Sequence, residues 1–270
     1  MNQKSILGLI IALGIPIACY LVLKSYSDNA VDMPRYYLLD TVVTKVQRGK
    51  TVDDSIWHKT ANIQLTNQLG DTVSLYDKEG KIIVLDFFFT SCRSICPSLT
   101  RNMAKLQQSF KKGGNVRNKI DTSIVQFMSF TVDPENDSVS VLKNYADRFG
   151  VNHDNWWMLT GNKKSIYDFA FQELKVDQFS EDPISPDFVH TNRFVLLDRN
   201  FVVRGYYNGL DTIALRKLSK DIGLLLLEKD KNKKSSVFRD IIDLSWLWLI
   251  IVVAVIFFMV YMSARRKING

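Results

Sequence analysis

One stretch of this sequence decides its fold: Phe87-Phe88-Phe89-Thr90-Ser91-Cys92-Arg93-Ser94-Ile95-Cys96-Pro97. An apolar run over residues 82–89 leads into it, and after Pro97 apolar residues recur at helical spacing as far as Phe110. The pattern predicts a buried strand, a loop, and an amphipathic helix that ends at Gly113-Gly114. Proline suits the first helical position because its missing N–H has no intrahelical partner there. Both thiols then lie in the loop or the first helical turn, where free backbone N–H groups favour thiolate over thiol.

The segments on either side of this stretch predict an α/β domain over residues 61–227. A β-hairpin is expected before the buried strand, with its arms at 63–65 and 73–75. Asp137 is expected to be the N-cap of a helix that carries Leu142 and Tyr145 and stops at Gly150. The remaining strands are expected at 124–132, 156–161, 189–197 and 201–206, and the remaining helices at 163–174 and 215–225. Strand–helix alternation that ends in a hairpin and a helix predicts a mixed sheet.

Two uncharged apolar runs, residues 5–23 and 244–262, flank this domain. Each has about the length that crosses a bilayer, roughly 20 residues. The sequence therefore predicts an N-terminal transmembrane anchor (1–24), a polar, irregular tether (25–60), a linker (228–243), a C-terminal transmembrane helix (244–262) and a basic tail (263–270). The first run could instead be a cleaved or lipidated signal; as an anchor, it holds Cys19 as a passive apolar residue. With both termini inside, the large domain lies outside the cytoplasm.

Composition narrows the classes of function. The formal net charge of +7 has its source in the segments that flank the apolar runs, and aromatic and basic residues do not interleave as they do on nucleic-acid surfaces. We therefore expect a membrane protein without a nucleic-acid partner. The chain has three cysteines, and one of them lies in the first apolar run, which excludes a disulfide-stapled scaffold. Two neighbouring cysteines in an extracytoplasmic domain indicate redox or metal chemistry.

Geometry constrains what Cys92 and Cys96 can do together. Residues i and i+4 of a helix have Cβ atoms about 5–6 Å apart, whereas a disulfide needs about 3.5–4.5 Å. A disulfide therefore requires Cys92 to lie in the loop before the helix, while a metal ion between the sulfurs relaxes that demand. His190, at the start of the strand expected at 189–197, is the candidate third ligand; His58 and His153 are interpreted as solvated or packing residues. Two thiolates and an imidazole suit copper(I), or zinc with a water as fourth ligand.

Four segments, in order, resemble the Sco/SenC family. The cysteine segment looks like the CxxxCP motif of that family, although Arg93-Ser94-Ile95 fills the gap where the family usually has an Asp. Residues 131–137, Thr-Val-Asp-Pro-Glu-Asn-Asp, are similar to its TVDPxxD segment, and residues 159–161 to its LTG. His190 falls where the family has its DHS-type histidine, with Thr191 in place of the frequent Ser. The resemblance covers residues 63–226, and a second transmembrane helix is not part of the usual family plan.

The resemblance implies a thioredoxin-like fold, anchored in a membrane and facing the periplasm or an equivalent space. It implies copper bound by Cys92, Cys96 and His190, and a copper chaperone that delivers the metal to the cytochrome c oxidase subunit carrying the copper site, or reduces the cysteines of that site. A thiol reductant is then a further partner. The alternative is a membrane-tethered thiol-disulfide oxidoreductase with Cys92 and Cys96 as its redox pair. A third interpretation, a peroxide-reducing relative, uses Thr90 and Arg93 but leaves the second cysteine and His190 unexplained. Asp133 either shapes the site or caps a turn.

Overall fold

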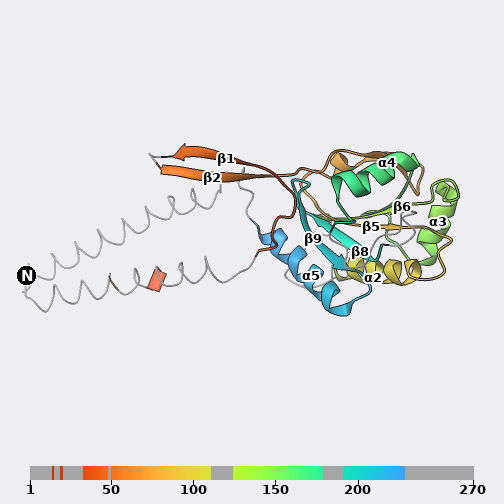
Figure 1. The fold of residues 1–270 in the computed structure, drawn as a ribbon. Helices are drawn as coiled ribbons and strands as arrows, with labels where there is room; N and C mark the ends of the chain where they lie inside the picture. Colours follow the sequence, from red (N-terminus) through yellow and green to blue (C-terminus); the bar gives the residue numbers. More distant parts are fainter. Residues whose placement is uncertain are drawn as a thin grey trace, which may run out of the picture. The chain divides into compact units, whose positions relative to one another are not determined.

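The computed structural model describes residues 33–47, 50–110, 124–178 and 191–228, together with Gly14, Cys19 and Tyr20. Its main element is a seven-stranded sheet with the strand order β4-β3-β7-β6-β5-β8-β9 (Figure 1). Strands β5, β6 and β7 run parallel, whereas each of the other pairs in the sheet is antiparallel. The predicted mixed α/β sheet is therefore confirmed. The strands are β3 (Gln64–Asn67), β4 (Thr72–Ser74), β5 (Ile82–Phe88), β6 (Val125–Thr131), β7 (Trp156–Thr160), β8 (Arg193–Leu197) and β9 (Val203–Asn208).

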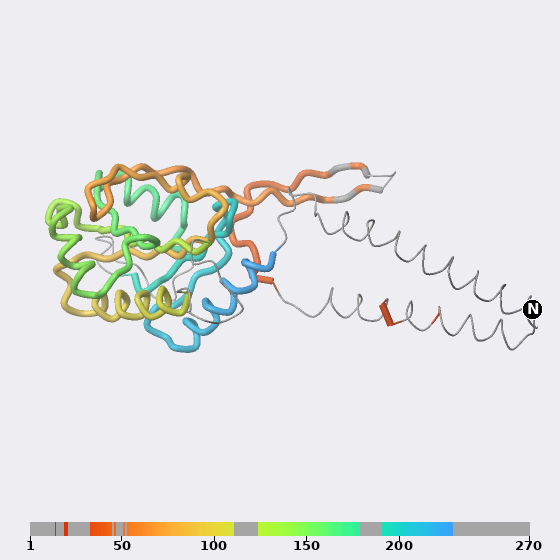
Figure 2. Tube along the Cα trace, turned by 180° about the vertical axis from the view of Figure 1, so that it is seen from behind, coloured from red at the N-terminus to blue at the C-terminus, as the bar shows by residue number. Residues whose placement is uncertain are grey.

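Helices cover both faces of the sheet. Figures 1 and 2 show α2 (Cys96–Ser109), α3 (Val139–Arg148) and α5 (Thr212–Leu227) on one side, and α4 (Lys163–Asp168) on the other. A π-helical turn, η3 (Phe169–Glu173), continues α4, and a 3-10 turn, η1 (Leu75–Lys78), follows β4. Every residue of β5 is buried, and its side chains alternate between the two cores. The continuous apolar run is thus explained, because the strand is covered on both faces.

Several predicted boundaries shift. Helix α2 ends at Ser109 rather than at Gly113-Gly114, because the N–H of Phe110 turns back to the carbonyls of Gln107 and Gln108. The helix predicted over 163–174 changes from α to π geometry at Phe169. Phe201 has a positive φ of 63°, so it belongs to the turn, and β9 begins two residues later. Strand β8 begins at Arg193; the predicted start at residues 189–190 lies outside the described residues.

The prediction of an irregular tether over residues 25–60 is wrong for its second half. Strands β1 (Leu39–Gln47) and β2 (Lys50–Trp57) pair antiparallel as a separate two-stranded sheet. A cross-strand hydrogen bond of 2.7 Å from the Thr44 hydroxyl to Asp53 Oδ1 supports the pairing. The scattered charges that indicated irregular chain are compatible with this hairpin because polar side chains can occupy its solvent-facing positions.

The turn between β8 and β9, together with the first residues of β9, holds both ends of the described domain. Arg204, only 2% exposed, donates hydrogen bonds of 3.0 and 2.6 Å to the Pro34 carbonyl and forms a 3.0 Å ion pair with Asp198. Its guanidinium also lies 4.0 Å from the centre of the Tyr36 ring. Arg199 donates a 3.0 Å hydrogen bond to the Leu226 carbonyl at the end of α5. Because β8 is antiparallel to β5, with Ile83 opposite Leu197, this turn lies at the end of the sheet where β5 begins.

The membrane predictions concern residues at the two ends of the chain. Within the described part of the chain, no helix is both long and apolar enough to cross a bilayer. Nearly all of 5–23 and all of 244–262 lie outside the described residues.

Candidate metal centre

The two neighbouring cysteines lie at the end of β5. The strand ends at Phe88, a short loop carries Cys92, and α2 begins at Cys96 with Pro97 next. Cys92 is therefore in the loop before the helix, as a disulfide would require. Both thiols are free in this structure, with exposed fractions of 6% for Cys92 and 3% for Cys96. The site thus presents two buried sulfurs at a helix N-terminus, where the free N–H groups favour negative charge.

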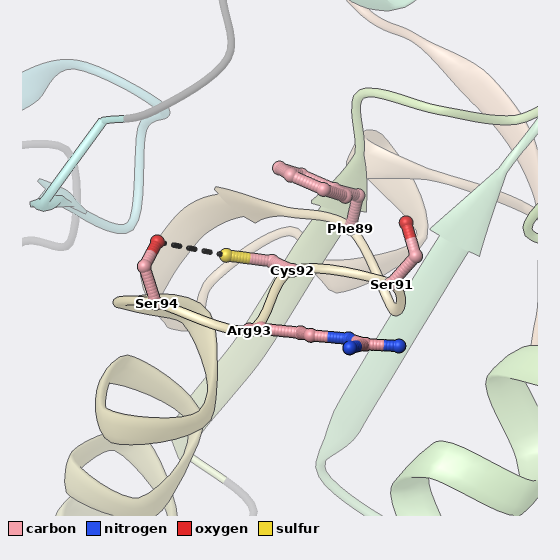
Figure 3. Close-up of a pocket in the computed structure, with 5 residues that line it drawn as sticks. All are labelled: Phe89, Ser91, Cys92, Arg93 and Ser94. Atoms are coloured by element: carbon pink, nitrogen blue, oxygen red, sulfur yellow. Dashed lines mark hydrogen bonds between the residues drawn. The ribbon is translucent and has the colours of Figure 1, made fainter.

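The pKa values of the two thiols shift in opposite directions. Burial by itself raises the pKa of Cys92, but hydrogen bonds from Ser94, from the Cys96 backbone N–H and from the Cys96 thiol outweigh it, and the pKa falls from 9.0 to about 7. The Ser94 hydroxyl lies 3.5 Å from the Cys92 sulfur (Figure 3). Burial raises the pKa of Cys96, and the neighbouring Cys92 and Asp86 raise it further. Cys92 is therefore the more readily ionised thiol.

Cys92 also borders an open pocket, together with Phe89, Ser91, Arg93 and Ser94 (Figure 3). The side chain of Arg93 extends away from the Cys92 sulfur in this view. That arrangement does not favour the peroxide-reducing interpretation, which needs the guanidinium close to the reactive thiolate. The pocket gives an incoming sulfur or metal ion access to Cys92.

A buried polar cluster lies below the loop. The Thr100 hydroxyl donates to the Cys96 carbonyl at 2.9 Å and accepts from the Tyr145 hydroxyl at 2.9 Å. Asp86 shares the face of β5 that α2 covers, and burial raises the pKa of its carboxyl group to about 7, although a hydrogen bond from Ser129 opposes the rise. Asp86 was not among the functional residues predicted from the sequence. Its position as the one charged residue in the otherwise apolar run 82–89 was the signal that could have identified it.

The predicted N-cap role of Asp137 is wrong. Ser138 is the N-cap of α3, and Asp137 is instead buried against the cysteine loop. Its carboxylate accepts hydrogen bonds from the Thr90 backbone N–H at 3.1 Å, from the Thr90 hydroxyl and from the Thr131 hydroxyl. Asp133 contacts its own turn, where it accepts two hydrogen bonds from the Asn136 amide. Of the two roles considered for Asp133, its observed contacts are those of a turn cap.

The three histidines differ in what the structure describes. His190 lies outside the described residues, so its position relative to the cysteines stays a prediction. His58 lies 3.0 Å from Asp40 and 3.1 Å from Glu173, and His153 lies 2.9 Å from Gln68. These two histidines have polar partners away from the cysteine loop, as expected for packing residues. Within the described ranges, no three Cys, His, Asp or Glu side chains are grouped so that they could hold a metal ion.

A mixed sheet that places two cysteines between an inner strand, β5, and the following helix defines the class: a thioredoxin-like dithiol domain. The model of the SCO1/SenC family matches residues 57–222, and the chain belongs to this family. It is 32% identical over 176 residues to the SCO1 protein homolog of Bacillus subtilis, covering 64% of this chain and 86% of that protein.

Two solved structures resemble the domain. One is BsSco, described as a member of the Sco family of cytochrome c oxidase assembly proteins with a disulfide switch; it is 29% identical, with a TM-score of 0.53, over 64% of this chain and 96% of that one. The other is a SCO1/SenC family lipoprotein from Bacillus anthracis, 30% identical, with a TM-score of 0.51, over 63% and 95%. Both likenesses extend over nearly the whole of the solved chains.

Proposed function

We propose that this protein is a membrane-anchored copper chaperone that assists assembly of the copper centre of cytochrome c oxidase. Membership of the SCO1/SenC family supports this, as does the description of BsSco as an oxidase assembly protein. Its partners are then the oxidase subunit that carries the copper site and a thiol reductant. The description of the B. anthracis relative as a lipoprotein supports a domain held at the outer face of a membrane, in the periplasm or an equivalent space. Residues 5–23 and 244–262 are the proposed anchors.

The proposed copper ligands are Cys92, Cys96 and His190. The observation that carries the proposal is the pair of free, buried thiols in hydrogen-bond contact at the start of α2. Sulfur donors are soft and suit copper(I), while an imidazole adds the nitrogen donor that copper(II) prefers. Thr191, 7% exposed, precedes β8, whose first residues lie beside the end of β5 that leads to Cys92. His190 directly precedes Thr191 in the sequence, which supports His190 as the third ligand.

Copper is the cargo of this site, and the two cysteines serve it differently. Cys92 borders the open pocket and ionises near neutral pH, so it meets an incoming or departing copper ion first. Cys96 is the first residue of α2, and its carbonyl accepts a hydrogen bond from the Thr100 hydroxyl. A recipient thiolate that enters the pocket can therefore exchange with Cys92 while Cys96 still holds the ion.

The test is copper stoichiometry in the wild-type protein and in two matched variants. His190→Ala is expected to lose copper(II) first and to bind copper(I) more weakly, because copper(I) persists on two thiolates whereas copper(II) prefers added nitrogen and oxygen donors. His153→Ala removes a histidine that contacts Gln68 and Asp147, and it is expected to keep both ions. Full copper(II) retention in His190→Ala would remove the third ligand from the proposal.

A second candidate is a membrane-tethered thiol-disulfide oxidoreductase. The observation that favours it is the unequal acidity of the thiols, since one ionised and one protonated cysteine suit attack followed by resolution. In that case the wild-type protein would exchange thiols rapidly yet bind less than one copper ion per chain. His190→Ala would then leave all measured properties unchanged.

A further inference from the structure

Asp137 is a buried carboxylate that joins the cysteine loop to the neighbouring strand. It is 1% exposed. One of its oxygens accepts from the Thr90 backbone N–H at 3.1 Å and from the Thr131 hydroxyl, and the other accepts from the Thr90 hydroxyl. Thr90 lies two residues before Cys92, and Thr131 is the last residue of β6. Hydrogen bonds to an ionised carboxylate are stronger than neutral ones, so the three together form a firm junction.

The position of Asp137 is itself fixed by its own turn. Its backbone N–H donates to the Asp133 carbonyl at 3.0 Å, and the next residue, Ser138, is the N-cap of α3. Beside this turn, the Val132 N–H donates to the Phe88 carbonyl at 2.8 Å, which extends the pairing of β6 with β5 to the edge of the loop. The carboxylate is therefore held by β6 and α3, and it transmits their position to Thr90.

The geometry points to Asp137 as the residue that positions Cys92 against Cys96, acting through Thr90. Cys96 needs no such device, because it belongs to α2 and its carbonyl is held by Thr100. Cys92 lies in a loop whose following residues, Arg93 and Ser94, are exposed. Without the junction at Thr90, the Cys92 sulfur would sample more positions, and its effective concentration near the Cys96 sulfur would fall. The inference rests on the proposed function, which needs the two sulfurs together as a ligand pair.

The dithiol–disulfide equilibrium of the metal-free full-length protein measures this positioning. In the exchange, two glutathione thiols reduce the Cys92–Cys96 disulfide, which yields two protein thiols and one glutathione disulfide. The variant is Asp137→Asn, and Thr90→Val, which removes only the hydroxyl donor, is a milder second variant. The matched control is Asp198→Asn, because Asp198 is also a buried carboxylate, 5% exposed, but lies at the opposite end of the sheet. Unfolding by denaturant is measured for all of them.

Asp137→Asn is expected to shift the equilibrium about tenfold towards the dithiol, which corresponds to about 30 mV in the two-electron potential. Thr90→Val is expected to shift the equilibrium in the same direction by a smaller factor. Thr90→Ser, which keeps the hydroxyl donor, is expected to have the wild-type value. Asp198→Asn is expected to lower stability without moving the potential. If Asp137→Asn and Thr90→Val lower stability and leave the potential at the wild-type value, Asp137 is only structural and the inference fails. A wild-type protein that binds no copper would instead overturn the proposed function and leave this result standing.

Discussion

The acidity of Cys92 has a consequence that depends on pH. With a pKa of about 7 instead of 9.0, about half of Cys92 is thiolate at pH 7, against about 1% of an ordinary thiol. The lower pKa also weakens the thiolate as a nucleophile, by about six- to tenfold for two units at a Brønsted coefficient of about 0.4–0.5. At pH 7, Cys92 is therefore expected to attack a disulfide reagent about five- to eightfold faster than a reference thiol of pKa near 9. Above about pH 8.2 the order reverses, because Cys92 is then almost fully ionised and gains no more, while the growing thiolate fraction of the reference thiol is the stronger nucleophile.

The assay is stopped-flow reaction with excess dipyridyl disulfide from pH 5 to 10, in a Cys19→Ala background. The rate is expected to fall as pH falls, with a midpoint near 7, because protonation removes the thiolate. Ser94→Ala removes the hydroxyl that contacts the sulfur and is expected to raise the midpoint. Ser91→Ala, from the same pocket, is the control and is expected to leave it unchanged. A midpoint near 9, or first modification at Cys96 by peptide mapping, would refute the reasoning.

Two further predictions concern stability. Arg204→Met is expected to lower the free energy of unfolding by about 3–5 kcal/mol, because it leaves the Asp198 carboxylate buried without its cation and the Pro34 carbonyl without its donor. A decrease below about 1 kcal/mol in urea unfolding would contradict the buried ion pair. For Asp86, the folded-state pKa of about 7 exceeds the ordinary 3.8, so the folded protein binds the proton more tightly and its stability falls as pH rises from about 4 to 7. Three units correspond to about 4 kcal/mol, and Asp86→Asn is expected to flatten this slope; an unchanged slope would show that Asp86 is not its source.

The local pattern was sufficient to predict the strand–loop–helix unit that carries the cysteines. Apart from Asp86, residues 82–89 are apolar because β5 is covered on both faces, and Pro97 marks the start of α2 because it has no N–H that needs an acceptor there. The family resemblance is likewise confirmed by the match over residues 57–222. In each case the signal lies in neighbouring residues, which share one secondary-structure element or one motif.

The roles that sequence reasoning missed depend on contacts between distant segments. Asp137 is of a residue type that often caps helices, and it lies just before the start of α3. Its hydrogen-bond partner Thr90, however, lies 47 positions away in the sequence. Arg204 likewise contacts Pro34 across 170 positions. No periodicity links such pairs, so local propensity assigned Asp137 to its helix and left Arg204 without a role. The β1–β2 hairpin was missed for another reason, since the Gly49 turn signal was present but the charged residues around it were interpreted as irregular chain.

The two ends of the described domain are held together where β8 and β9 meet. Arg204 in β9 holds the Pro34 carbonyl, and Arg199 in the turn holds the carbonyl of Leu226 at the end of α5. The cysteine loop follows the other end of β5, whose seven residues span about 20 Å at roughly 3.3 Å per residue. If the chain is anchored at both ends, as proposed above, we expect tension to reach the sheet near these two arginines, at the end away from the dithiol.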